Sequence, residues 1–581
     1  MMSWHQWRKF WLGSGVTRFK KRSGPWTSLI SRCGQLFGIG CLSTLLYPAT
    51  TVAAEQVSLF YGPFEFSISV SSLERFAREG TVDSELAAYA KHAKPEEIAE
   101  FRQILSYRLN LGVVPVSQFL YSSFGEISLR FLGNLIQTEA HQNGFYALRA
   151  SLILAAADPE GLTLLNVLKK FPTRTMRINS EFALEMVRGF TDLYHQTQQA
   201  TTLIERQFDA EAKTEPAINP DLAPKLDQPG EWKWTQETLT LDDRRRQRRF
   251  VVDLYRPQRP DSVSTLIISP GLWASRSNFA ELAQHLASHG FAVVVMDHPG
   301  SNRQQLEALL AGRAREVVRT SEFIDRPLDV SYLLDELQRR TQTPVSGQGT
   351  LNLQSVGIIG HSFGGYTALA LAGATFDLAS LRQECESSQI NLNVGNISLL
   401  LQCSAIGLSP QAVNRLRDPR VQAVVALNPI GSQIFGPQGI GQLQVPVMLV
   451  SGSEDAIAPA LLEQICPFTW LTTPNQYLVL IQKGSHTYAS ANTNQNDPFN
   501  APELAGPDPA LAYRYLNTMT LAFAKNHLAA APVSASFLQA SYVRSISQPP
   551  LPLKLVRSLD EPEVAQAMTQ LCPRPTVAQN P

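Results

Sequence analysis

Short apolar runs rich in β-branched residues recur between residues 265 and 481 and predict the strands of a buried sheet. They contain few polar positions, as expected of strands that are covered on both faces. The runs are 265–269, 291–296, 355–359, 421–427, 447–451 and 477–481. Helical patterns separate them, and this alternation is typical of an α/β doubly wound, mostly parallel sheet. Two alternating segments before the sheet, 237–241 and 250–255, predict a hairpin.

Residues 55–206 have a different pattern, and we expect them to form a separate, small, all-helical domain. Apolar positions at helical spacing cover 145–157 and run from about 179 to 207. Asp158-Pro159-Glu160 has the composition of a helix start, because it offers an N-cap, a first-turn proline and an acid near the helix dipole.

Prolines then crowd residues 207–231, which predicts a linker. The expected α/β domain covers 232–530 and includes a lid-like insertion at 376–418. A C-terminal helix and tail are expected over 531–581.

The first 54 residues predict an export signal. They contain seven Lys and Arg residues and no acid, followed by an apolar run at 36–47 and the small residues Val52-Ala53-Ala54. Basic, then apolar, then small is the order found in secretory signals. We therefore expect export to the periplasm, the thylakoid lumen or the extracellular space. Membrane anchoring through an uncleaved N-terminus is the alternative.

Composition and charge narrow the class of protein. Of the 581 residues, 44% are hydrophobic and 17% are charged, which excludes a wholly disordered chain and a polytopic membrane protein. The residues after position 54 hold 43 basic and 50 acidic side chains. This mildly acidic body argues against nucleic acid as the main partner. The arginine-rich run 244–249 is expected to be a solvated hairpin tip rather than an anion-binding patch.

Four cysteines follow the export segment, and their spacing matches no zinc pattern: Cys385, Cys403, Cys466 and Cys572. An oxidising compartment would permit pairing. Cys385 and Cys403 lie in the same insertion, which favours a bridge between them, and four free thiols are the alternative.

A candidate nucleophile lies in Gly360-His361-Ser362-Phe363-Gly364. This G-x-S-x-G segment follows a predicted strand and precedes a helical pattern, which is the context that the motif requires. The sharp turn exposes the hydroxyl of Ser362, and the two glycines remove side chains that would clash. We therefore predict that Ser362 is a catalytic nucleophile.

A serine nucleophile needs a base and an orienting acid, which in this fold class follow it in the order acid, then histidine. His486 follows the predicted strand 477–481, whereas His527 lies late in a helical pattern and is expected to be structural. Asp455 follows the predicted strand 447–451 and is the expected acid, with the adjacent Glu454 as the alternative. Both loops lie at the carboxyl ends of parallel strands, where such sheets place their sites.

The oxyanion that forms during acyl transfer needs two preorganised N–H donors. We expect one from the backbone of Phe363 and the other from Leu272, which follows Gly271 in the loop after strand 265–269. Trp273 and Phe363, with apolar residues of the insertion, are expected to line an apolar pocket. This chemistry needs no cofactor and no metal. The isolated His92, His141 and His195 are expected to be structural.

With these motifs in place, the chain resembles the α/β-hydrolase superfamily, and within it the platelet-activating-factor acetylhydrolase and dienelactone-hydrolase-like branch. The resemblance covers about residues 235–530. It rests on Ser269-Pro270-Gly271-Leu272, Asp297-His298-Pro299-Gly300-Ser301, Arg326-Pro327-Leu328-Asp329, Gly360 to Gly365, and Gly452-Ser453-Glu454-Asp455 with His486. It implies ester hydrolysis through Ser362, Asp455 and His486, with Leu272 and Phe363 at the oxyanion hole. Pro270 stands where we would expect a histidine.

Residues 57–180 resemble the N-terminal domain of unknown function found on cyanobacterial hydrolases of this type. The likeness rests on Tyr61-Gly62-Pro63 and on the segments 143–150 and 156–161. It implies no activity for this half of the chain.

The expected function is a serine carboxylic-ester hydrolase that acts on short-chain or lipid-derived esters through an acyl-enzyme. The expected partner is this small-molecule or lipid ester, with possible association with a membrane surface. A peptidase or a thioesterase with the same triad is one alternative. A non-catalytic binding protein on a hydrolase fold is another. The acyl length and the oligomeric state stay open.

Overall fold

The computed structural model describes residues 53–572, except 62, 92, 217, 219–224, 341–348, 387–391, 488–505 and 530–534. The chain divides into two compact units. The first is made of the described parts of Met1–Val113 and Leu132–Ser180, and the second of Val114–Phe131 and Glu181–Pro581. The expected export segment lies outside the described residues up to position 52, as does His92. Within the described part, no helix is both long enough and apolar enough to cross a bilayer.

The first unit contains a four-stranded sheet with the order β2-β1-β4-β3. Its strands are β1 (Gln56–Tyr61), β2 (Phe64–Ser69), β3 (Ile136–Gln137) and β4 (Thr175–Asn179). Helices surround it: α2 (Val70–Glu79), α3 (Ser84–Ala90), α4 (Pro95–Ser106), α7 (Phe145–Ala157) and α8 (Leu164–Lys169). Helices predominate, as expected, but the expectation of an all-helical domain is wrong. The strand β1 pairs antiparallel with the adjacent β2 and in parallel with β4 from the far end of the unit.

Helix α7 has the bounds that the sequence predicted, whereas the helix start predicted at Asp158 is wrong. Asp158 instead ends α7, and its N–H bonds the carbonyl of Ala155. The next helix, α8, begins only after Thr163, whose side chain accepts the N–H of Asn166. Gly161 turns the chain between them at a φ of +75°.

Helix α9 (Ser180–Thr214) has 35 residues and runs further than the pattern indicated, into the segment expected to be a linker. Within the second unit, α9 contacts residues of the C-terminal segment. Glu205 Oε1 forms an ion pair of 2.8 Å with Lys554 Nζ, and Asp209 accepts a hydrogen bond of 2.5 Å from Arg544. Helices α5 (Val113–Leu120) and α6 (Ser123–Leu135) lie largely in the second unit.

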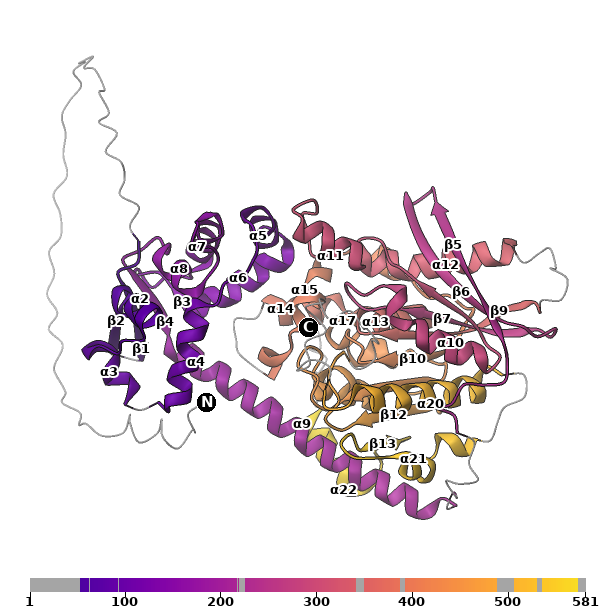
Figure 1. Ribbon diagram of the computed structural model, residues 1–581. Coiled ribbons are helices and arrows are strands. Elements are labelled where there is room, and N and C mark those ends of the chain that lie inside the picture. Colours follow the sequence, from indigo (N-terminus) through magenta and orange to yellow (C-terminus); the bar gives the residue numbers. More distant parts are fainter. Residues whose placement is uncertain are drawn as a thin grey trace, which may run out of the picture. The chain divides into compact units, whose positions relative to one another are not determined.

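The second unit is built on a nine-stranded sheet with the order β13-β12-β11-β10-β9-β7-β8-β6-β5 (Figure 1). The neighbouring strands from β8 through β7, β9, β10 and β11 to β12 pair in parallel. The expected doubly wound, mostly parallel sheet is therefore confirmed. Its elements are β7 (Val263–Ser269), β8 (Ala292–Met296), β9 (Leu351–His361), β10 (Val421–Leu427), β11 (Val447–Gly452) and β12 (Gln476–Ile481). The predicted hairpin forms the antiparallel edge as β5 (Trp234–Asp243) and β6 (Arg248–Pro257).

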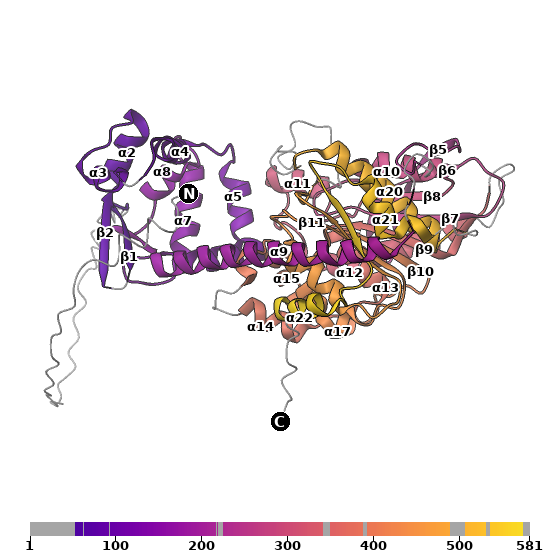
Figure 2. The ribbon, with the colours of Figure 1, turned by 90° about the horizontal axis from the view of Figure 1, so that it is seen from below.

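Helices cover both faces of this sheet, as Figure 2 shows. One face carries α10 (Ala280–Ser288) and α20 (Pro509–His527), and the other carries α12 (Glu322–Arg340), α13 (Phe363–Ala372) and α17 (Ser432–Ile440). This double cover buries every residue of β8, which explains its unbroken apolar sequence. Two of the shorter helices of this unit are α11 (Arg303–Leu310) and α18 (Cys466–Trp470).

The C-terminal segment holds more structure than the expected helix and tail. It forms α21 (Ala540–Ile546), β13 (Leu553–Val556) and α22 (Pro562–Leu571), and β13 adds an antiparallel strand beside β12. A disulfide joins Cys466 at the start of α18 to Cys572 after α22. The sequence pattern predicted neither the strand nor this bridge.

Candidate active site

Ser362 lies at the sharp turn between β9 and α13. Its backbone has a φ of +54° and a ψ of −116°, a conformation that costs a non-glycine residue roughly 1–3 kcal/mol. A Cβ on Gly360 would lie 2.0 Å from the carbonyl oxygen of Gly364, and a Cβ on Gly364 would lie 1.8 Å from that of Ser269. Only glycine fits at both positions, so the sequence forces the strained turn that presents Ser362.

Asp455 and His486 meet at the carboxyl ends of β11 and β12. His486 Nδ1 lies 2.7 Å from Asp455 Oδ2. Asp455 Oδ1 accepts the N–H groups of Ile457 and Ala458 at 2.9 Å and 2.8 Å, and the carboxylate is fully buried. Glu454 is exposed, so its carboxylate does not take this place. The structure therefore pairs His486 with the predicted acid rather than with its neighbour.

His361 links the nucleophile turn to the histidine loop. Its Nε2 lies 2.9 Å from the carbonyl oxygen of His486, and the two rings are 5.1 Å apart. Burial, followed by the neighbouring His486, lowers the pKa of His361 to about 3, so this imidazole is neutral and donates the bond. No hydrogen bond joins the Ser362 hydroxyl to His486 among the residues described. Such bonds are often long before substrate binds.

The loop after β7 approaches the same turn. A Cβ on Gly271 would lie 3.2 Å from Ser362 Cβ, so the backbone of this loop passes close to the candidate nucleophile. The N–H of Trp273 donates to the carbonyl of Ser301 at 2.6 Å, whereas the N–H of Leu272 has no acceptor in the described part of the chain. Phe363 is the first residue of α13, and the N–H groups in the first turn of a helix have no acceptor within the helix.

The expectation that Phe363 lines an apolar pocket is wrong. Its side chain is 0% exposed, and its ring packs 4.8 Å from Phe323 and 5.3 Å from Tyr366. The side chain of Phe363 is therefore part of the core, and only its backbone stays a candidate for the site. Trp273 is partly buried, and its indole N–H donates to the carbonyl of Val317 at 3.3 Å.

The insertion at 376–418 is hydrogen-bonded to the loop that carries Asp455. It contains α14 (Leu378–Glu386), α15 (Ser398–Cys403) and α16 (Pro410–Val413), and a Cys385–Cys403 disulfide confirms the favoured pairing. The N–H of Ser398 donates to the carbonyl of Ile457, which is next but one to Asp455, at 2.8 Å.

A buried carboxylate fastens this insertion. Glu463 is 2% exposed, and its Oε1 accepts Asn396 Nδ2 at 2.6 Å and Gln402 Nε2 at 2.7 Å from the insertion. Its Oε2 accepts the N–H groups of Gly431 and Ser432, both at 3.0 Å, at the start of α17. One carboxylate thus joins the insertion to α17.

Two further predictions concern a histidine and a run of arginines outside the candidate triad. His527 ends α20, half-buried beside Tyr477 Oη at 3.2 Å, and takes no part in the cluster around Ser362. The expectation of a solvated arginine run is wrong for two of its members. Arg246 and Arg248 are 19% and 10% exposed in their side chains and bind Asp329 at 2.9 Å and 2.7 Å. The described residues hold no cluster of three metal-ligating side chains.

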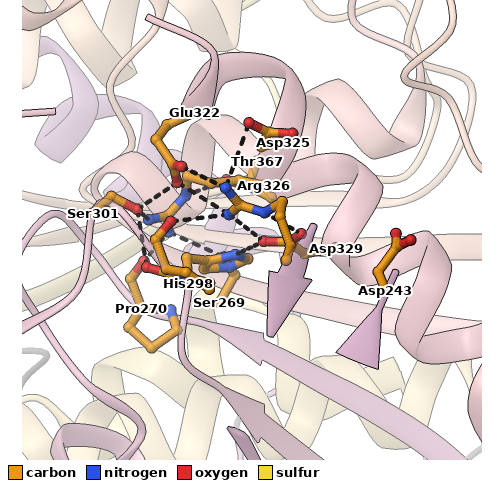
Figure 3. A network of polar contacts seen from close by, with 12 residues as sticks. Asp243, Ser269, Pro270, His298, Ser301, Glu322, Asp325, Arg326, Asp329 and Thr367 are labelled. Atoms are coloured by element: carbon orange, nitrogen blue, oxygen red, sulfur yellow. Dashed lines mark hydrogen bonds and ion pairs between the residues drawn. The ribbon is translucent and has the colours of Figure 1, made fainter. Parts of the chain in front are cut away.

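A buried polar network next to the turn was not predicted. It centres on Arg326, which contacts Ser301, Thr367 and the carbonyl of Pro270 (Figure 3). The signal in the sequence was the Arg326-Pro327-Leu328-Asp329 segment, which carried part of the family resemblance without a role.

Comparisons with known proteins agree with the fold. Residues 53–179 match a family model described as "Alpha/beta hydrolase of unknown function (DUF1400)", and residues 264–377 match one described as "alpha/beta hydrolase fold". The chain is 28% identical to Cutinase est1 and 27% identical to Cutinase est2, both from Thermobifida alba, over 131 residues. That is 22% of this chain and 36% and 35% of the two cutinases, so the match spans about a third of these relatives.

Proposed function

We propose that this protein, whose second unit has the α/β-hydrolase fold, is a serine carboxylic-ester hydrolase that acts on short-chain or lipid-derived esters. The carrying observation is the 2.7 Å hydrogen bond between His486 and Asp455, together with the 2.9 Å bond that joins His486 to His361, the residue before the strained Ser362. Strain of this kind persists where the surrounding structure requires it, and it clusters at active sites. The partial similarity to two cutinases supports an ester as substrate.

In the proposed reaction, Ser362 Oγ attacks the ester carbonyl while His486 Nε2 takes the hydroxyl proton. Asp455 stabilises the imidazolium that forms. The N–H groups of Leu272 and Phe363 stabilise the oxyanion of the tetrahedral intermediate. The C–O bond to the alcohol then breaks, and His486 returns the proton to the leaving alkoxide. Water repeats these steps on the acyl-enzyme and releases the acid.

The finer resemblance to the platelet-activating-factor acetylhydrolase and dienelactone-hydrolase-like branch belongs to this proposal. It is supported by the motifs at 269–272, 297–301 and 326–329, through which the chain resembles that branch. It favours small or lipid-derived esters over polymers.

Hydrolysis of p-nitrophenyl esters from acetate to palmitate by the full-length chain tests the proposal. We expect Ser362→Ala and His486→Ala to lower kcat by roughly 10⁴- to 10⁶-fold. His527→Ala is the matched control, because it removes a histidine that lies away from Ser362, and we expect near-normal activity. A fluorophosphonate should label the wild type at Ser362. Wild-type activity retained in Ser362→Ala, or correctly folded wild type that neither hydrolyses nor labels, would refute the proposal.

We also propose that the protein is exported, and the two disulfides support this because such bonds persist in oxidising compartments. Mass spectrometry of the native N-terminus tests it. A mature chain that begins near residue 55 is expected. A chain that starts at Met1 in the membrane fraction would instead support the uncleaved anchor.

A further inference from the structure

A buried network of charges reaches Pro270, which lies two residues before Leu272 in the loop after β7 (Figure 3). Arg248 enters it from the hairpin and binds Glu322 at 2.8 Å and Asp329 at 2.7 Å, both on α12. Both carboxylates are fully buried. Ser301 Oγ donates to Glu322 at 2.9 Å, which extends the network towards the sheet. The next member along is Arg326.

Arg326 contacts the two backbone segments that carry the proposed oxyanion donors. Its Nη2 donates to the carbonyl oxygen of Pro270, two residues before Leu272. Its Cζ lies 4.6 Å from the centroid of the Phe363 ring, and its Nε donates to Thr367 Oγ1 at 3.1 Å, one turn along α13. One guanidinium therefore spans the end of β7 and the start of α13.

The other contacts of Arg326 hold it in place. Nη1 donates to Ser301 Oγ at 2.8 Å, and Ser301 in turn is bonded to Glu322. No carboxylate pairs directly with Arg326 among the described residues. The side chain is 1% exposed, and burial lowers the pKa of Arg326 to about 9, so it keeps its charge at neutral pH.

A guanidinium suits this task because it is planar and its donors have a fixed mutual geometry. Binding Pro270 in its plane and the Phe363 ring on its face sets the relative position of the two segments. The proposed oxyanion hole needs a fixed distance between these two segments, because its two N–H groups come from different segments and must point at one oxygen.

We propose that Arg326 is a positioning residue of the oxyanion hole, which keeps the N–H groups of Leu272 and Phe363 directed at the same point. The proposal rests on the proposed function above. Donors aimed at the oxyanion act mainly in the transition state, so their misplacement lowers kcat more than it raises KM.

The test compares Arg326→Lys with Arg246→Lys. Arg246 belongs to the same network through Asp243 and Asp329, but it contacts neither Pro270 nor Phe363. Lysine keeps the positive charge but lacks the planar guanidinium with its fixed set of N–H donors. For Arg326→Lys we expect kcat to fall roughly 100-fold with KM within about threefold. The infrared carbonyl band of its acyl-enzyme should move to higher wavenumber, because the carbonyl is less strongly hydrogen-bonded. Arg246→Lys should keep the wild-type kcat and band.

A folded Arg326→Lys with wild-type kcat and band would overturn the proposal, and so would equal losses in both variants. If Arg326→Lys fails to fold, Thr367→Val decides, because it removes one acceptor of Arg326 without changing charge or shape. We then expect kcat to fall roughly tenfold, with a smaller shift of the band. Unchanged values would overturn the proposal. An inactive wild type would instead count against the ester hydrolase itself.

Discussion

His486 and Asp455 are joined by a hydrogen bond in which only one oxygen of the carboxylate takes part. The other oxygen, Oδ1, is bonded to two backbone N–H groups at Ile457 and Ala458. This arrangement fixes the plane of the carboxylate and requires a proton on His486 Nδ1. Nε2 then keeps its lone pair, which is the form that a general base needs.

Replacing Asp455 by Asn should remove most of the activity and leave the fold intact. An amide can present its N–H₂ group to the imidazole, which favours the tautomer with the proton on Nε2. We expect kcat to fall by about 10⁴-fold, measured with a p-nitrophenyl ester. Glu454→Gln is the matched control, because that side chain is exposed, and its kcat should stay within about twofold of the wild type. Similar losses in both variants would argue against Asp455 as the orienting acid.

Gly364→Ala should destabilise the protein because the new Cβ would meet the carbonyl oxygen of Ser269 at 1.8 Å. Backbone at the end of a central strand cannot move aside cheaply, so we expect a loss of about 3 kcal/mol in the free energy of unfolding. The control is Gly407→Ala, where a Cβ would have no neighbour within 4 Å. Urea unfolding measures both variants, and equal stabilities would show that the turn can relax.

Glu463→Gln should loosen the insertion at 376–418. The amide would turn an N–H₂ group towards donors that now point at a carboxylate, among them Asn396 Nδ2 and Gln402 Nε2. We expect the free energy of unfolding to fall by about 3 kcal/mol. Hydrogen exchange of the 398–403 helix should accelerate. The exposed Glu307→Gln, which loses a surface ion pair with Arg303, should cost no more than about 0.5 kcal/mol. Unchanged exchange in Glu463→Gln would contradict the fastening role.

Stability should decrease as the pH falls from 6.5 towards 4. Burial, as the largest cause, lowers the pKa of several histidines from the ordinary 6.5. The pKa falls to about 4 for His285 and His527, and to about 3 for His298 and His361. In this window the unfolded chain binds protons that the folded chain does not, so each histidine contributes a slope of up to about 1.4 kcal/mol per pH unit. Glu322, whose pKa burial raises, opposes the trend.

Urea unfolding at pH 8, 7, 6 and 5 measures this slope. His285→Gln, which removes a histidine far from Ser362 in sequence, should flatten it. A stability that rises as the pH falls over this range would contradict the assignment of neutral buried histidines.

The sheet of the second unit and the loops that carry the proposed triad were predictable because their signals are local. An apolar run such as 421–427 predicts a buried strand by itself. Gly360 and Gly364 indicate a turn that has no room for side chains. The order of Ser362, Asp455 and His486 then followed from where each stands after a strand. These features depend on neighbours within a few residues along the chain.

The polar network was not predictable in the same way. Arg246 and Arg248 lie in a run of arginines that looks solvated, and their burial is tolerable because they pair with carboxylates, among them the distant Glu322 and Asp329. The strand β4 was missed for a related reason, since its parallel partner β1 lies at the other end of the unit. Long-range pairing leaves little trace in a single sequence.

The Cys466–Cys572 bridge joins two residues with a sequence separation of 106 and makes a covalent ring of the chain from α18 to the end of α22. His486 lies inside this ring, and Ser362 and Asp455 lie outside it. A protease that cuts the ring once would yield two polypeptides on a reducing gel and a single molecule without reductant. Backbone damage in that stretch would therefore leave the proposed base attached to the part of the enzyme that it serves.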